Sequence, residues 1–477
     1  MTSDPDLKVN PPGAHRTEQD RRRALWAAMF GTLIEYYDFY LYALVAAIAL
    51  GPLFFPQADP TVGLIASFAT LAVGWFARPV GALIMSLVGD RLGRKNVLLI
   101  TVLLMGIATF LIGILPTYSS IGVAAPIMLV FLRTIQGLAA GGEFAGALLM
   151  SVEYARPNRR GRASTATTFG QYGGIILANV VLLAVSLLPE EQFMDWGWRV
   201  PFLASAALLA VGVLLRARVK ETPVFEAARK TSGLSERPVT GMIRTQRRPL
   251  LRLVGVMLIV ATATAFYTSY LPAYAIQSDF SASAALAMSL VGTIVGFVVA
   301  PAAAAASDHL GRRRVASIGA VLNPFLVWIA FESVGQGSLF FVIVAGVLAA
   351  LAQSLVLGPV AVWVSEFFPT RYRYSGASIG YQVSSAIGAG IFPLAAASLM
   401  AAAGGPPHFG LVVAYVAVIA AVSLVAMHFS PETSRATFAD LDGDEPQESA
   451  GSRAQGGRSE DPPTTGPTHA TRRKVDP

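Results

Sequence analysis

The sequence Gly-Asp-Arg-Leu-Gly-Arg-Lys occupies residues 89–95, directly after a long apolar run. A related sequence, Ser-Asp-His-Leu-Gly-Arg-Arg, follows another apolar run at residues 307–313. A second pair of related loops contains Glu153 and Glu366, and each glutamate is followed by a proline, an arginine and a glycine. Both pairs occur in the same order along the chain. We therefore predict two halves of similar topology that are related by a parallel repeat.

The chain around these loops is apolar. Hydrophobic residues make up 54% of the 477 residues and charged residues only 14%, whereas soluble proteins carry about 25% charged residues. Apolar runs of about 18 residues or more recur, and each can cross a bilayer core of about 30 Å as a helix. We predict an all-α polytopic membrane protein with twelve transmembrane helices in two six-helix halves. The helices are expected at about residues 25–50, 62–88, 96–115, 123–150, 164–188, 199–217, 250–277, 283–306, 314–332, 337–365, 376–403 and 408–430.

The positions of lysine and arginine predict the orientation of the chain. All 36 of these residues except Arg78, Arg133 and Arg199 lie in the two tails or in alternate loops. Basic loops remain in the cytoplasm, so both termini are expected to be cytoplasmic, in a bacterial inner membrane. The net charge of +7 is explained by this topology, and we expect no binding to nucleic acid.

The same features predict the domain organisation. A cytoplasmic tail at residues 1–24 precedes the first half at residues 25–217, and a cytoplasmic linker at residues 218–249 leads to the second half at residues 250–430. Residues 431–477 are rich in glycine, proline, serine, threonine and charged residues, a composition typical of a disordered tail.

Several enzyme signatures are absent from the sequence. It contains no cysteine, no phosphate-binding Gly-x-x-x-x-Gly-Lys-[Ser/Thr] loop, and no His-Glu-x-x-His or Gly-x-Ser-x-Gly motif. We therefore expect no enzyme, no cofactor and no metal site. The expected partners are a small-molecule substrate, protons and the lipid bilayer, and the protein is expected to be a monomer.

Five charged residues lie deep inside the expected helices of the first half: Glu35, Asp38, Arg78, Arg133 and Glu143. Each costs a few kcal/mol at the bilayer centre unless it is paired or hydrated, so such residues point to function. Glu35 and Asp38 are three residues apart and share a helix face. A carboxyl group between a second carboxylate and an arginine can take up and release a proton. We predict proton coupling by Asp38, Glu35, Arg133 and Glu143; the alternative is static ion pairing.

Neutral polar and aromatic groups in the expected helices are candidates for binding an organic solute, together with Arg78, which can pair with a nearby acid or with a substrate carboxylate. Any one of them can instead be an ordinary contact between helices. The predicted substrate-binding residues are Tyr37, Arg78, Gln136, Gln171, Tyr267, Tyr270, Tyr381 and Gln382.

The repeated cytoplasmic loops are candidates for gating. Their glycines permit tight turns, and an aspartate can accept hydrogen bonds from a helix N-terminus and pair with an arginine. Such a cluster would hold the halves together on one side and separate during opening; the alternative is a basic loop that only sets topology. The predicted gating residues are Gly89, Asp90, Arg91, Gly93, Arg94, Asp308, Arg312, Glu153 and Glu366.

These motifs resemble the major facilitator superfamily, whose signature cytoplasmic loop is similar to residues 89–95 and whose fourth-helix motif is similar to residues 133–137. More narrowly, the sequence resembles the metabolite:H⁺ symporters, which include shikimate, α-ketoglutarate, citrate and proline/betaine transporters, and the shikimate type most of all. The resemblance implies the major facilitator fold and proton-coupled import of an organic acid or zwitterion by alternating access. An antiporter that exports a metabolite or drug is the alternative. The matching stretches lie at residues 35–39, 78–81, 141–143, 197–202, 221–225 and 369–376.

Overall fold

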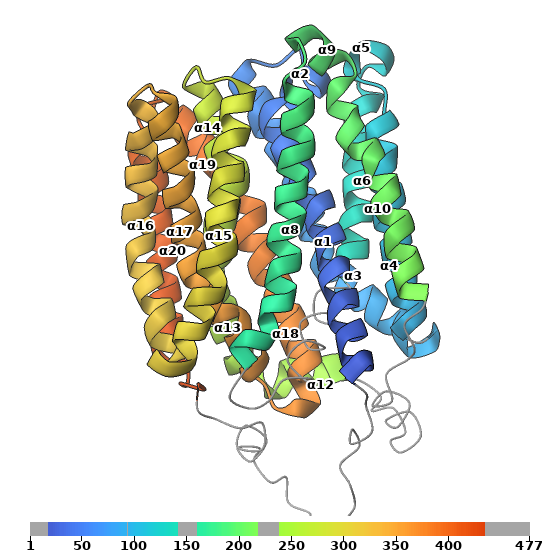
Figure 1. Ribbon diagram of the computed structural model, residues 1–477, viewed down its shortest axis with the longest axis vertical. Coiled ribbons are helices and arrows are strands. Elements are labelled where there is room, and N and C mark those ends of the chain that lie inside the picture. Colours follow the sequence, from blue (N-terminus) through green and yellow to red (C-terminus); the bar gives the residue numbers. More distant parts are fainter. Residues whose placement is uncertain (1–17, 93, 142–159, 218–237, 435–477) are drawn as a thin grey trace, which may run out of the picture.

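The computed structural model describes residues 18–92, 94–141, 160–217 and 238–434, and every regular element within these ranges is a helix. The helices stand side by side in one bundle (Figure 1). The six long segments of the first half are α1 (Glu18–Ile48), α3 (Pro60–Leu92), α4 (Arg94–Ile114), α6 (Ala124–Ala140), α8 (Arg160–Ser186) and α10 (Val200–Ala217).

The second half also contributes six long segments, and two of them are interrupted by a turn of π-helix. The interrupted segments are α13 (Arg247–Ala265), η3 (Phe266–Tyr270) and α14 (Leu271–Gln277), and later α18 (Thr370–Ser385), η5 (Ala386–Gly390) and α19 (Ile391–Ala402). The continuous segments are α15 (Ala282–Leu310), α16 (Arg312–Gly335), α17 (Leu339–Trp363) and α20 (Gly410–His428).

Short helices mark the two ends of the bundle. One end, called the α9 end here, carries α2 (Leu50–Phe54), α5 (Tyr118–Ile121) and α9 (Glu190–Asp195). The opposite end, called the α12 end, carries α12 (Pro238–Thr245). The first described helix begins and α20 ends at the α12 end (Figure 1), as an even number of crossings requires.

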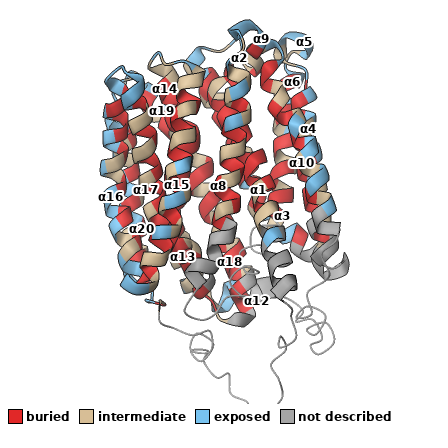
Figure 2. Ribbon diagram, in the orientation of Figure 1, coloured by how far each residue is buried: buried red, intermediate tan, exposed pale blue. Residues whose placement is uncertain are grey.

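The prediction of twelve transmembrane helices is confirmed. Within the described ranges, nine segments are long and apolar enough to cross a bilayer, and Leu99–Ile114 and Ala124–Ala140 are shorter apolar helices. The remaining segment is α1, which carries Glu35 and Asp38. Large exposed side chains such as Phe131, Val298 and Phe340 cover the outer surface, and buried residues fill the interior (Figure 2). This distribution suits a lipid environment.

Glycines bring the second and fourth long segments of each half into backbone contact. A Cβ atom on Gly137 of α6 would lie 2.2 Å from the carbonyl oxygen of Gly74 in α3. In the second half, a Cβ atom on Gly346 of α17 would lie 2.3 Å from the carbonyl oxygen of Met288 in α15. Small residues permit such close approach of membrane helices. The same device therefore recurs in the corresponding helix pairs of the two halves.

Replacement of Gly137 by alanine is expected to force α3 and α6 apart, because the added methyl group meets backbone atoms that cannot move independently. Overpacking of this kind typically costs about 1–3 kcal/mol, and thermal unfolding of the detergent-solubilised protein measures the loss. Gly335→Ala is the matched control, since nothing lies within 4 Å of a Cβ atom at that position. Equal unfolding temperatures for the two variants would contradict the close α3–α6 contact.

Candidate functional site

A cavity lies between the two halves. Its volume is about 60 Å³, taken as the space open to the centres of water molecules. Helices α1, α3 and α8 line it from the first half, and α13, α17 and α18 from the second. Among the described residues, its lining contains no charged side chain. The polar and aromatic lining residues are Thr32, Tyr36, Tyr40, Trp75, Thr168, Gln171, Thr264, Tyr381 and Ser385.

The cavity extends toward the α12 end, since the lining residues Ala361 and Val364 lie at the end of α17 and directly after it, and Thr168 lies in the first third of α8. Toward the α9 end it narrows to a chamber of about 10 Å³, which shares Tyr40 and Trp75 with the main cavity. Beyond that chamber, aromatic side chains of the two halves meet. The rings of Phe68 in α3 and Tyr270 in η3 lie 6.4 Å apart between centroids.

Hydrogen bonds join the halves at and beside the cavity. The hydroxyl groups of two lining residues, Tyr36 in α1 and Tyr381 in α18, lie 3.1 Å apart. Outside the lining, the Tyr172 hydroxyl group of α8 donates to Oε1 of Gln353 at 2.6 Å and lies 2.9 Å from the Ser354 hydroxyl group. Gln353 donates in turn to Thr264, a lining residue, at 3.3 Å. The cavity is therefore held between the halves by neutral, breakable contacts.

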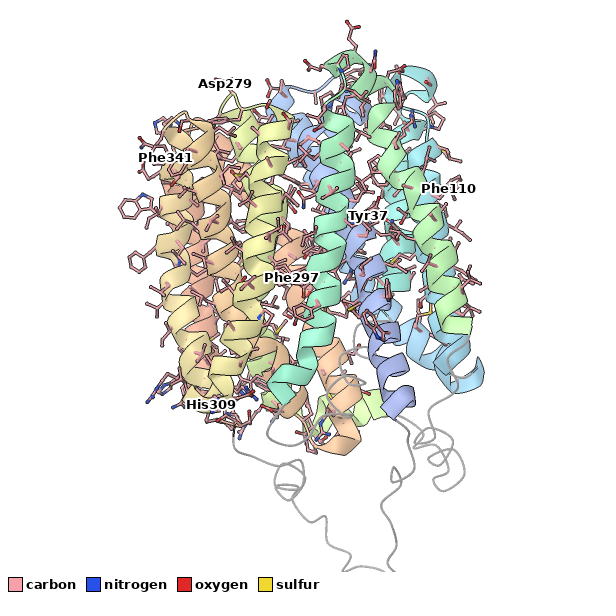
Figure 3. All side chains as sticks on the ribbon, viewed as in Figure 1. Tyr37, Phe110, Asp279, Phe297, His309 and Phe341 are labelled. Carbon is pink, nitrogen blue, oxygen red and sulfur yellow. The ribbon has the colours of Figure 1, made fainter. Side chains whose placement is uncertain are left out.

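Tyr172 fits against the second half because α15 has a glycine at the contact. A Cβ atom on Gly296 would lie 2.6 Å from the Tyr172 ring. Nearby, the rings of Phe169 in α8 and Phe297 in α15 stack with centroids 4.6 Å apart. Figure 3 labels Phe297 at this contact. Both contacts place α8 directly against α15.

Four charged side chains that the sequence singled out are buried in the first half next to this cavity: Glu35, Asp38, Arg78 and Arg133. Nη1 of Arg78 lies 3.3 Å from Oε1 of Glu35. Cζ of Arg78 also lies 3.7 Å from the ring centroid of Phe39 and 4.3 Å from that of Trp75. Asp38 is 1% exposed and interacts electrostatically with Arg133.

Arg133 is held by aromatic and amide groups. Its Cζ lies 3.8 Å from the ring centroid of Tyr42, and its Nη1 donates to Oε1 of Gln136 at 2.7 Å. Gln136 donates to the Thr109 hydroxyl group at 2.7 Å. Among the described residues, Nε and Nη2 of Arg133 have no hydrogen-bond partner. A Cβ atom on Gly74 would lie 2.7 Å from Nη2, so this glycine makes room for the guanidinium.

The structure separates the predicted substrate-binding residues into two groups. Gln171 and Tyr381 line the cavity, and Arg78 lies directly behind the wall that Trp75 forms. The others make structural contacts away from the lining. In the first half, Tyr37 (Figure 3) donates to the Pro201 carbonyl oxygen at 2.7 Å, and Gln136 bonds to Arg133 and Thr109. In the second half, Tyr267 contacts Thr293 and Ser289, and Tyr270 donates to the Ala396 carbonyl oxygen. Gln382 donates to the Gly141 carbonyl oxygen of the first half.

The predicted site residues do not include the large aromatic lining residues Tyr36, Tyr40 and Trp75, nor the smaller lining residues Thr32, Thr168 and Ser385. A usable signal was present on α1, because Thr32, Tyr36 and Tyr40 follow at intervals of four residues. That spacing places them on one helix face. The acidic residues drew attention instead to their neighbour Tyr37, which points to α10.

The predicted gating residues of the second half come together at the α12 end. Nη1 of Arg312 lies 2.6 Å from Oδ1 of Asp308, and Nε of Arg312 lies 3.5 Å from Oε2 of Glu366. The Thr433 hydroxyl group donates to Glu366 at 2.6 Å. Of the corresponding first-half set, Gly93 and Glu153 lie outside the described residues, as does Glu143. Gly89, Asp90, Arg91 and Arg94 lie at the ends of α3 and α4, where side chains are not described.

Glu432, which follows α20, caps the N-terminus of α16. Its carboxylate accepts the backbone N–H groups of Arg312 at 2.8 Å and of Arg313 at 3.0 Å. Burial acts to raise the pKa of Glu432, but the backbone hydrogen bonds from Arg312, Ser434 and Arg313 outweigh it, so the pKa is lowered. The segment after α20 is thereby tied to the loop between α15 and α16.

Comparison with known families identifies the architecture. The family model of the Major Facilitator Superfamily matches residues 28–304, more than half of the chain. The chain belongs to the major facilitator superfamily. A second family model, Sugar (and other) transporter, matches residues 226–444. The resemblance noted in the sequence motifs is confirmed, and both matched families are families of transporters rather than enzymes.

This superfamily member is 37% identical over 428 residues to the inner membrane metabolite transport protein YhjE of Escherichia coli (strain K12), which covers 87% of this chain and 94% of that protein. It is 36% identical over 394 residues to the shikimate transporter of the same organism, and this alignment covers 81% of this chain and 90% of that transporter. Its structure matches the partially occluded inward open conformation of the xylose transporter XylE from E. coli with a TM-score of 0.70 at 18% sequence identity. The match covers 88% of this chain and 100% of the XylE chain. That similarity shows a shared fold.

Removal of the Tyr172 hydroxyl group in Tyr172→Phe is expected to weaken the contact between the halves, because Gln353 and Ser354 lose a buried partner. An unsatisfied buried group costs about 1–3 kcal/mol, and thermal unfolding in detergent measures the effect. Tyr415→Phe is the control, since the ring contact of Tyr415 with Phe392 stays within the second half. A loss no larger in Tyr172→Phe than in the control would contradict this role.

Replacement of Glu432 by glutamine is expected to lower stability at neutral pH by about 0.5–1 kcal/mol, because an anionic cap at a helix N-terminus is lost. The folded-state pKa of Glu432 lies below the ordinary value, so its contribution is present at neutral pH and disappears as the pH falls through that lowered pKa. Unfolding curves of the two proteins should therefore converge in acid. Glu332→Gln, an exposed change on the same helix, is the control.

Proposed function

We propose that this metabolite transporter is a proton-coupled symporter that imports a small organic acid or zwitterion by alternating access. The observation that carries the proposal is the group of buried charges in α1, α3 and α6 directly beside a cavity between the halves. In transporters built from repeated halves, substrate and coupling ions bind near the bilayer midplane at the interface of the repeats. The relatives named as transporters of metabolites and of shikimate support the substrate class.

Asp38 is the proposed entry point of the proton. It is 1% exposed, it lies one helical turn from Glu35, and it interacts electrostatically with Arg133. Glu35 pairs with Arg78 at 3.3 Å, and the entering proton is assigned to Asp38 because it lies on the same helix face as Glu35 and interacts with Arg133. Protonation cancels one buried negative charge, which changes the cost of moving the site through a closed state.

The proposed orientation places the α12 end in the cytoplasm. The cavity extends toward that end, so the described conformation would be accessible from inside and closed by Phe68 and Tyr270 on the outside. The basic residues of the loops at this end support the orientation. We propose a bacterial inner membrane location with both termini in the cytoplasm, and a monomer as the transporting unit.

Asp38→Asn is expected to lower pH-driven uptake at least about tenfold, because the amide cannot exchange the coupling proton. Uptake into right-side-out vesicles with an acidic exterior is measured for labelled shikimate, 4-hydroxybenzoate, 2-oxoglutarate, citrate and glycine betaine, and the solute that the wild type accumulates is used for the variants. Asp279→Asn is the control, because Asp279 is exposed in the turn after α14 and asparagine tolerates its positive φ of 66°.

Wild-type rates in Asp38→Asn, at equal amounts in the membrane, would refute the assignment of the proton to Asp38. If an acidic exterior drives none of these solutes inward, import itself is refuted. Solute expulsion from inverted vesicles would then indicate the antiport alternative.

A further inference from the structure

The cavity is walled by neutral groups, yet a buried cation lies directly behind one of them. Arg78 is 2% exposed, and its Cζ lies 4.3 Å from the ring centroid of Trp75, which lines the cavity. Two further lining residues, Tyr40 and Tyr381, interact electrostatically with Arg78. The guanidinium is therefore one side chain away from a solute in the cavity. Its present anionic partner is Glu35, at 3.3 Å.

Among the buried charged residues of this group that the structure describes, the charges cancel. Glu35 and Asp38 contribute two negative charges, and Arg78 and Arg133 contribute two positive charges. Uncompensated charges at this depth are costly, so a loaded site is favoured when its charges again sum to zero. One proton together with one singly charged anion meets that condition. One proton with a zwitterion leaves an excess positive charge, and one proton with a dicarboxylate leaves an excess negative charge.

We propose that the substrate is a monocarboxylate carried with one proton, and that its carboxylate pairs with Arg78 in place of Glu35. The proton that enters at Asp38 resides on Glu35 in the loaded state, so no charge is left uncompensated. A guanidinium suits this exchange, because it binds carboxylates through two parallel hydrogen bonds. The inference rests on the proposed symport and goes beyond it by assigning the substrate charge and the stoichiometry.

The groups that interact with Glu35 come from several elements. Tyr36 lies on α1 itself, Arg78 comes from α3, and Tyr381 from α18. Beside this group, Asp38 of α1 and Arg133 of α6 interact with each other, and Arg133 also interacts with Arg78. Removing the negative charge of Glu35 leaves Arg78 as the uncompensated cation next to the cavity.

The rest of the cavity suits the body of a ring acid that carries hydroxyl groups. Trp75, Tyr36, Tyr40 and Tyr381 present aromatic rings that can pack on flat apolar faces. Hydroxyl and amide groups lie between these rings, including the Tyr36–Tyr381 pair and Gln171. A few placed polar groups in an apolar pocket orient a ligand through its own polar edge.

The first test measures binding to the purified full-length protein between about pH 6 and about pH 8, where carboxylic acids are ionised. The probes are 4-hydroxybenzoate and shikimate, with 4-hydroxybenzamide as the neutral control and citrate and glycine betaine as the other charge classes. We expect a monocarboxylate to bind and the others not. The Kd of the monocarboxylate should rise as the pH is raised, by up to tenfold per pH unit. Tenfold is the limit when one proton is taken up with each bound anion. Tighter binding of citrate, betaine or the amide, or no binding of either monocarboxylate, would overturn the proposal.

The second test uses variants that fix the charge of the site. Glu35→Gln reproduces the proton-loaded site, so it should bind the monocarboxylate at pH 8 at least as tightly as the wild type does at pH 6, without the tenfold slope. The double variant Glu35→Gln/Arg78→Gln keeps the net charge of the wild type and should bind it at least tenfold more weakly. Glu332→Gln, an exposed change on α16, is the control. A wild-type slope in Glu35→Gln, or wild-type affinity in the double variant, would overturn the proposal.

Failure of this inference and failure of the proposed symport give different results. If a zwitterion or a dicarboxylate is the solute that an acidic exterior drives inward, symport stands and the monocarboxylate assignment is wrong. If a monocarboxylate binds with uptake of one proton but is not accumulated in response to a pH gradient, the assignment stands and the symport is wrong.

Discussion

The ion pair between Arg78 and Glu35 is the interaction on which the interior of the first half depends. Both residues are only 2% exposed, so neither charge is solvated by bulk water. Breaking such a pair leaves an uncompensated buried charge, which costs about 3–5 kcal/mol. Aromatic rings supply further stabilisation, since Phe39 lies 3.7 Å from Cζ of Arg78 and 4.7 Å from Cζ of Arg133. A desolvated cation–π contact is worth about 2 kcal/mol. The charge group is thereby kept compact beside a cavity with neutral walls.

The cost of charge in a membrane also explains what could be predicted from the sequence. Apolar runs must be long enough to cross the bilayer, so twelve helices could be counted without knowledge of their packing. The same cost makes a buried charge rare, and the four that the structure describes, Glu35, Asp38, Arg78 and Arg133, do lie together. The repeated loops that contain Asp308, Arg312 and Glu366 likewise predicted a cluster at one end of the second half. These three side chains do meet there.

The cavity lining was harder to predict, because it depends on how each helix is rotated against its neighbours. Tyr36 and Tyr37 are adjacent in sequence, but one lines the cavity and the other bonds to α10. In α13 and η3, a helical stripe would place Thr264 and Tyr267 on one face. The structure has a turn of π-helix from Phe266, and a π turn adds a residue that rotates the following side chains. Thr264 therefore reaches the cavity, whereas Tyr267 bonds to α15.

Contacts within and between the halves differ in kind, and this difference favours motion of the halves as units. Within each half, Gly137 and Gly346 bring helix backbones together at distances that leave no room for even one methyl group. Between the halves, the hydrogen bonds that the described residues form include neutral ones, such as those of Tyr172 and of the Tyr36–Tyr381 pair, each worth about 0.5–1.5 kcal/mol. A solute that touches both Gln171 and Tyr381 can replace a few such bonds by its own. The difference between the solute's affinities for the open and the closed arrangement of the halves then determines which arrangement is populated. The packing inside each half is left unchanged.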